Sequence, residues 1–81
     1  MHNLFSLNEL KVGQSASVVQ IRGGHGIQRR LQSLGIRPGV IVRKVSAAFG
    51  PGPVVIAFSR GQAALGYGVA RKVILGGGET A

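Results

Sequence analysis

The sequence has no cysteine, no tryptophan, only two acidic residues, and only one tyrosine and three phenylalanines among its 81 residues. The lack of cysteine excludes a disulfide framework and a thiolate metal site. Small secreted domains usually depend on disulfides, so we expect a cytosolic protein. The longest apolar run covers residues 54–58, far short of the ~20 residues of a membrane-spanning helix.

The few residues that could carry acid–base or metal chemistry are far apart in the sequence. Glu9 and Glu79 are the only acids, and His2 and His25 the only histidines. Catalysis by paired carboxylates needs two acids that face one substrate, and no serine has a neighbouring histidine and acid. A stable metal site needs three or four ligands brought together. We therefore predict no enzymatic activity, no cofactor and no metal site within one chain.

The charge is strongly one-sided, because ten Lys and Arg residues face two acids and give a net charge of +8. This imbalance indicates an acidic partner: nucleic acid, an anionic membrane surface or an acidic protein surface. The basic residues are spread along the chain. They form either a solvated surface that keeps the protein soluble or a basic face, for which Arg22, Arg29 and Arg37 are the candidates. Both interpretations remain open at this point.

One segment, from Ile27 to Leu34, has a clear helical pattern. Ile27, Leu31 and Leu34 recur at positions i, i+4 and i+7 and form one apolar stripe. Gly35 follows at the position where a left-handed residue ends a helix. We therefore expect Leu31 and Leu34 to be buried, Gly35 to have a positive φ angle, and Arg29 to point away from the stripe.

The rest of the chain consists of short β-branched segments separated by glycine-rich turns, a pattern typical of strands. Single helical turns are expected at 6–10, where Ser6 and Glu9 have the spacing of a capping box, and at 66–71. Five short strands and one helix predict a small closed β-barrel formed by residues 1–75, followed by a disordered tail, 76–81. The core should include Val18, Val42 and Ile56. The predicted strands are 15–21, 40–47, 54–58, 62–65 and 72–75.

The segment 30–39 (RLQSLGIRPG) resembles the signature R-L-x-x-L-G-apolar-x-x-G of the FeoA (ferrous iron transport protein A) family. The segments 6–14 and 21–24 and the glycine–proline hairpin at 49–53 also resemble that family, as do Ala64-Leu65, Ala70 and Ile74 near the end. The resemblance covers most of the chain between Leu4 and Leu75. The signature residues, which we expect to be structural, are Arg30, Leu31, Leu34, Gly35 and Gly39.

This resemblance implies an all-β, SH3-like barrel with the short helix inserted between the first two strands. It also implies a cytosolic, non-enzymatic accessory protein of ferrous iron uptake. Its partner is then FeoB, a membrane transporter with a GTP-binding domain, and contact with the membrane is only through that transporter. In this interpretation Arg22, Arg29 and Arg37 are charged contacts, and Phe49 and Tyr67 supply apolar anchors.

The alternative is a small basic RNA-binding barrel, since a charge of +8 also suits phosphate. Binding of this kind needs exposed aromatic side chains near the basic groups, on which bases can stack. Phe58 alternates with Val54 and Ile56 and is predicted to lie in the core, which leaves few such residues. We therefore favour a protein-binding adaptor and do not expect nucleic acid as the partner.

Overall fold

The computed structural model of the protein describes residues 3–48 and 50–77. Phe49, one of the two expected aromatic anchors, lies outside the described residues, as does most of the predicted tail. The elements, in chain order, are β1 (Phe5–Ser6), the 3-10 helix η1 (Leu7–Glu9), β2 (Ser15–Ile21), α1 (His25–Leu34), β3 (Ile41–Ala47), β4 (Val54–Phe58), β5 (Gly61–Leu65), α2 (Tyr67–Ala70) and β6 (Val73–Gly76).

The five predicted strands are all present, and a short sixth strand, β1, precedes them. With only Phe5 and Ser6, β1 is too short to show the alternation that identifies a strand. Phe5 pairs with Leu75 and Ser6 with Ile74 of β6. The predicted helical turn follows directly as η1, where the Ser6 amide donates a hydrogen bond to Glu9 Oε2 at 3.4 Å.

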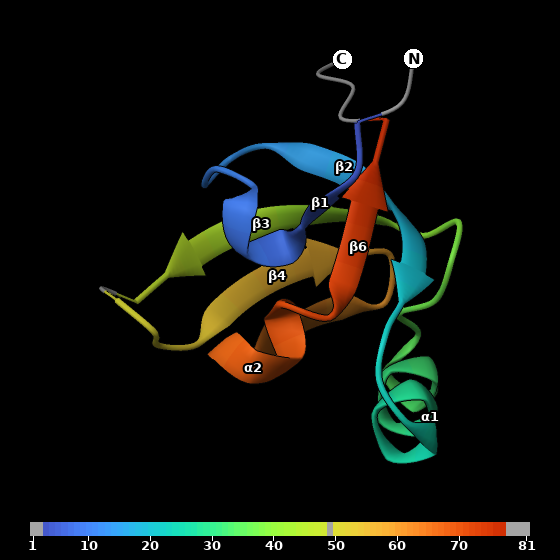
Figure 1. Cartoon of the computed structure of the whole chain (residues 1–81). Helices are drawn as coiled ribbons and strands as arrows, with labels where there is room; N and C mark the ends of the chain where they lie inside the picture. Colours follow the sequence, from blue (N-terminus) through green and yellow to red (C-terminus); the bar gives the residue numbers. More distant parts are fainter. Residues whose placement is uncertain (1–2, 49, 78–81) are drawn as a thin grey trace.

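The six strands form one antiparallel sheet in the order β1-β6-β2-β3-β4-β5, which coils into an SH3-like barrel (Figure 1). The first part of β2 pairs with β3 and its second part with β6. Irregularities in register between Val18 and Gln20 and between Lys44 and Ser46 interrupt the ladders. Such bulges bend strands and increase their twist, which allows the sheet to curl.

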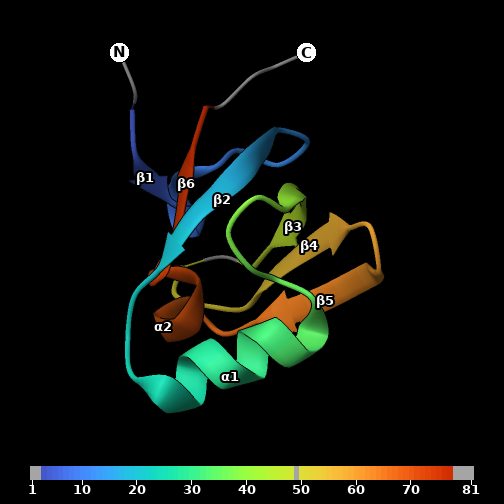
Figure 2. The same ribbon diagram turned by 90° about the vertical axis from the view of Figure 1, so that its right-hand side faces the viewer.

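The ends of the sheet do not pair with each other in the described part of the chain, so the barrel is less closed than predicted. η1 packs against α2 and β6 near this opening, and Leu7 of η1 and Ala70 of α2 are completely buried. The predicted helix is α1. It lies between the first two long strands, β2 and β3, at one end of the barrel (Figures 1 and 2).

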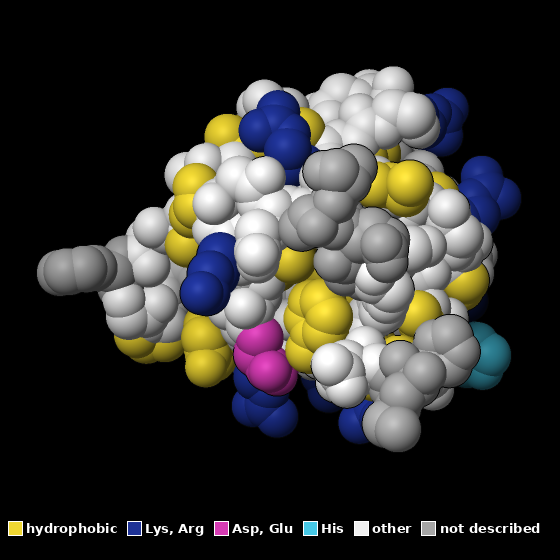
Figure 3. Space-filling view, turned by 90° about the horizontal axis from the view of Figure 1, so that it is seen from above, with side chains coloured by type: hydrophobic (Ala, Val, Ile, Leu, Met, Phe, Trp, Pro, Cys, Tyr) yellow, Lys and Arg dark blue, Asp and Glu magenta, His cyan; other side chains and the backbone are white. Residues whose placement is uncertain are grey.

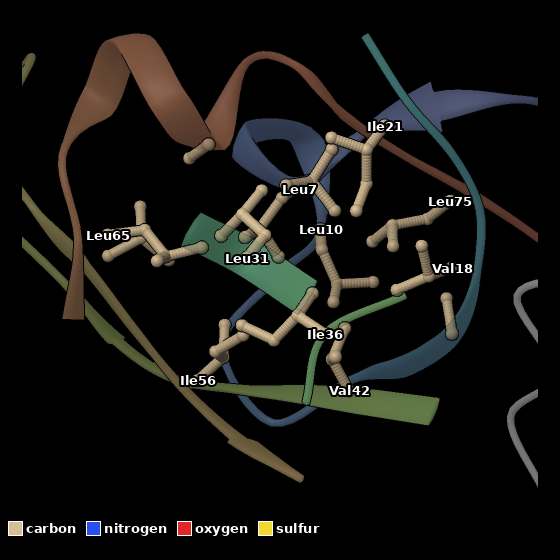
Figure 4. Packing of buried hydrophobic residues seen from close by; sticks show 14 residues of the cluster. Leu7, Leu10, Val18, Ile21, Leu31, Ile36, Val42, Ile56, Leu65 and Leu75 are labelled. Carbon is tan, nitrogen blue, oxygen red and sulfur yellow. The ribbon is translucent and has the colours of Figure 1, made fainter. Parts of the chain in front are cut away.

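The core is a continuous aliphatic cluster to which α1 contributes one fully buried side chain (Figure 4). Leu31 is 0 % exposed and lies close to Leu7, Ile36 and Leu65. The predicted core residues Val18, Val42 and Ile56 are also buried, which confirms the assignment of strand faces.

The prediction that Leu34 is buried is wrong, because this side chain remains 39 % exposed. Leu34 is the last residue of α1. The chain reverses direction at Gly35, and the next side chain, Ile36, is 0 % exposed. Ile36 is therefore buried in the core in place of Leu34, the last residue of the predicted apolar stripe.

We predict that Leu31→Ala lowers the free energy of unfolding by about 2–5 kcal/mol, the usual cost of emptying a buried leucine site. Leu34→Ala is the matched control, since truncation of a partly exposed leucine should cost well under half as much. Urea unfolding followed by circular dichroism measures both. Equal losses for the two variants would contradict the described position of α1.

Candidate partner-binding surface

The start of α1 is held by Gln28 instead of a side chain at the N-cap position. Gly24 occupies that position in an extended conformation and has no side chain with which to cap. The amide of the Gln28 side chain donates a hydrogen bond to the carbonyl of Ile21, the last residue of β2. The Arg22 amide donates to the Lys72 carbonyl at 2.8 Å. These bonds fix the loop that carries Arg22 at the start of the helix.

The end of α1 is a left-handed turn at Gly35, whose φ angle is 96°, as predicted. The Gly35 amide donates to the carbonyls of Leu31 and Gln32, and the Ile36 amide to Leu31 at 2.9 Å. A Cβ atom on Gly35 would lie only 2.5 Å from Cδ of Arg60. The stem of Arg60 therefore lies across the carbonyl end of the helix, where a cation is electrostatically favourable.

Arg37 lies just beyond this turn, at the head of β3. Its carbonyl accepts the Val40 amide at 3.1 Å, and the next two bonds, from Gly39 to Val18 and from Val18 to Val40, are both 2.8 Å long. Gly39 has a φ angle of 97°. The signature residues Gly35 and Gly39 are thus the two left-handed positions that bring the chain from the helix into the sheet.

The three predicted arginine contacts are all exposed around α1: Arg22 before it, Arg29 on it and Arg37 after it. Arg30 is also exposed, and with Gly26, Ile27, Leu31 and Val69 it lines a hollow of about 240 Å³ between α1 and α2. Seen from above Figure 1, basic side chains are scattered over the visible face and along its edge and do not gather in one patch (Figure 3). That the three arginines act as one face stays a prediction.

Tyr67, the predicted aromatic anchor, is 42 % exposed at the start of α2. Its carbonyl accepts a hydrogen bond from Nδ2 of Asn8 at 3.4 Å, so the first turn of α2 is joined to η1. Tyr67 does not line the hollow between the helices. Its side chain is available to a partner, but it lies on α2, whereas the three arginines lie on or beside α1.

Lys44 is a basic residue that does not belong to the surface. It is only 4 % exposed, and its Nζ donates to the Asn8 carbonyl at 3.1 Å. Burial lowers the pKa of Lys44 below its ordinary value of 10.5. The alternation of β3 could have shown this, because Val42 and Lys44 are two residues apart and side chains two apart in a strand share a face.

The same alternation leaves Ile41 and Arg43 on the outer face, where they line a groove that the sequence analysis did not identify. We call this the β3–β4 groove; it measures about 580 Å³. Ile41 is 63 % exposed. Phe58 was predicted to lie in the core, but it is only partly buried: it packs against the core and also lines the groove. The lining residues are Gly39, Val40, Ile41, Arg43, Ala57, Phe58 and Ser59.

Within residues 3–48 and 50–77, no three His, Cys, Asp or Glu side chains come close enough to hold a metal ion. His25 is exposed at the start of α1, beside a hollow of about 350 Å³ that Gln28 and Gln32 also line. No helix in the described part of the chain has the length and apolar character that a membrane crossing requires.

Fold and site together define a small SH3-like domain whose accessible surface is basic and partly apolar. The FeoA domain model matches residues 5–75. The chain therefore belongs to the FeoA family, which is linked to ferrous iron transport. No curated protein sequence is similar enough to count as a match.

Solved structures agree with this assignment. An iron uptake regulatory protein (FeoA) is 30 % identical, with a TM-score of 0.79 over 90 % of this chain and 95 % of that one. Stenotrophomonas maltophilia FeoA complexed with zinc, described as a prokaryotic SH3 domain protein, is 31 % identical, with a TM-score of 0.76 and 88 % coverage of both chains. A manganese-dependent transcriptional repressor is 18 % identical, with a TM-score of 0.85 over 93 % of this chain and 42 % of its own, and shares the fold alone.

We predict that Gly35→Ala destabilises the protein by at least about 1 kcal/mol, because an L-residue is strained in the left-handed region and its Cβ displaces Arg60. Gly39→Ala has the same kind of strain but no atom within 4 Å of the added Cβ, so it should cost less. Thermal unfolding of both variants, with and without Arg60→Ala, separates the two causes. If Arg60→Ala does not reduce the loss of stability caused by Gly35→Ala, the clash between the added Cβ and Arg60 does not contribute to that loss.

We also predict that Lys44 makes stability depend on pH. Between its lowered pKa and 10.5, the unfolded chain binds more protons than the folded one, so this contribution to the free energy of unfolding rises with pH. The penalty of burying the charged form is fully present below the lowered pKa. Lys44→Met removes this dependence. Unfolding of both proteins by urea from neutral pH to about pH 10 should show their stability difference moving in favour of the wild type.

Proposed function

We propose that this chain is a cytosolic, non-enzymatic accessory protein of ferrous iron uptake that docks on the transporter FeoB through protein–protein contacts. The observation that carries the proposal is the match of the FeoA domain over residues 5–75. It is supported by the structurally similar Stenotrophomonas maltophilia FeoA, for which a role as a bacterial ferrous iron transport activating factor has been suggested.

The charge distribution supports a partner with an acidic surface. Among the described residues, Glu9 is the only acid, and Arg22, Arg29 and Arg37 are exposed around α1. A guanidinium group presents a planar fork of donors that matches a carboxylate. Long-range attraction between a protein of charge +8 and an acidic partner would also speed their association.

The RNA-binding alternative has less support. A strand of bases is held by several aromatic side chains near cations. Of the aromatic residues that the structure describes, Phe5 and Phe58 are partly buried and pack against the core, and Tyr67 lies alone on α2. Charge favours nucleic acid as much as protein, but the aromatic positions do not.

The charge reversal Arg29→Glu with Arg37→Glu tests the surface around α1. We expect transporter-dependent ferrous iron uptake to fall by about tenfold or more, because two attractive contacts become repulsive. The matched control is Lys11→Glu with Arg71→Glu, which makes the same change of charge at exposed residues that are not among the three candidate arginines. Circular dichroism checks that both variants fold. Normal uptake by a folded Arg29/Arg37 variant would show that this surface does not dock the transporter.

A further inference from the structure

We propose that the β3–β4 groove binds an acidic protein segment that inserts one apolar side chain. The groove lies beyond the turn that follows α1, so it extends the basic surface already described onto the outer face of the sheet. The inference rests on the proposed function only for the identity of the protein that carries the segment. The chemistry of the groove itself selects the class of ligand.

The lining of the groove is mainly apolar and open to solvent. Ile41 is 63 % exposed, although it is the first residue of β3 and pairs with Ser17 of β2. Val40 and Phe58 are partly buried beside it, and Ala57 adds a small side chain that keeps the groove hollow. An aliphatic or aromatic side chain of a partner would shield Ile41 from water and contact Phe58.

Arg43 is the one charged residue that lines the groove, so the charge of its wall is positive. Arg60 follows the lining residue Ser59 in the sequence, but its stem packs against Gly35 at the end of α1. No acid lines the groove. Glu9, the only acid of the described residues, accepts a hydrogen bond from Ser6 at η1. A carboxylate next to an apolar anchor would complement Arg43.

The groove is formed before any ligand arrives. Val40 is bonded to β2 through Val18, and Arg43 pairs with both Ser15 of β2 and Ala57 of β4. The stem of Arg60 rests on Gly35. Binding to a preformed groove avoids the entropic cost of ordering it, which makes a short peptide a sufficient ligand.

Two other occupants fit less well. A second copy of this chain would bring another net charge of +8 to the same surface, with like charges opposed. Single-stranded RNA would satisfy the arginines, but its bases stack on aromatic faces. Phe58 is the one aromatic residue that lines the groove, and it is partly buried. The exposed centre is Ile41, which has no aromatic face.

The experiment is a titration of the ¹⁵N-labelled full chain, followed by amide chemical shifts. The probe is the capped peptide Asp-Glu-Leu-Phe-Glu-Asp, and the control peptide has lysine in place of every acid. We expect saturable shifts at Ile41, Arg43, Ala57 and Phe58 with the acidic peptide alone, weakened by salt. Ile41→Ser should weaken binding by about tenfold, and Arg43→Gln should weaken it as well.

Matched controls separate the groove from general surface effects. Val12→Ser alters another β-branched side chain of similar exposure, 59 % against 63 % for Ile41. Arg71→Gln removes one exposed charge from α2. Both variants should bind the peptide like the wild type. Uptake that falls in the Ile41→Ser variant but not in Val12→Ser would assign the groove to the transporter.

Three results would overturn the inference. Shifts spread over all exposed arginines would mean charge attraction without a site, and unaltered binding by Ile41→Ser would mean that the groove is not the site. Oligouridine that produces the same localised shifts at lower concentration than the peptide would assign the groove to nucleic acid. The charge reversal at Arg29 and Arg37 tests docking separately, because neither residue lines the groove.

Discussion

The left-handed turn at Gly35 determines how α1, the start of β3 and the stem of Arg60 lie relative to one another. Because Gly35 reverses the chain at the end of α1, Leu31 and Ile36 enter the same core from opposite sides of the turn. This fixes where α1 lies and where β3 begins. The absence of a side chain at Gly35 gives Arg60 its position across the helix end. A single glycine therefore sets the geometry of two adjoining surfaces, the one around α1 and the β3–β4 groove.

Much of the fold could be predicted from the sequence, because the strands have β-branched residues between glycine-rich turns and the helix has one apolar stripe with a glycine stop. Three features could not. β1 is recognised only through its pairing with β6, Leu34 is exposed because the turn sends Ile36 inward, and Phe58 is shared between the core and a groove. β1 and Phe58 depend on segments distant in sequence, and Leu34 depends on the direction that the chain takes after Gly35; helical and strand periodicity report neither.

The exposure of the candidate surface residues was predicted only in part, because charge and burial have different sequence signals. Arg29 could be found from the helix pattern, and Arg22 and Arg37 from the loops that flank the predicted helix. Lys44 and Ile41 interchange the expected roles: the lysine is inside and the isoleucine outside. The alternation of β3 places both side chains on the correct face. Residue type alone, however, assigns a lysine to the surface and an isoleucine to the core. The exchange also places apolar surface beside Arg43 on the outer face.

The pairing of Phe5 with Leu75 has a consequence for the connectivity of the chain. It places the first and last strands side by side, and antiparallel partners have Cα atoms about 4.5–5.5 Å apart. The arrangement of the strands in the sheet therefore does not require the polypeptide to begin at β1. A circular permutant joined across β1 and β6 and opened at the exposed turn between β4 and β5 would retain every pair of strands. In such a molecule Ser59 and Arg60 become chain termini, and the rigid rim of the groove becomes its most adjustable part.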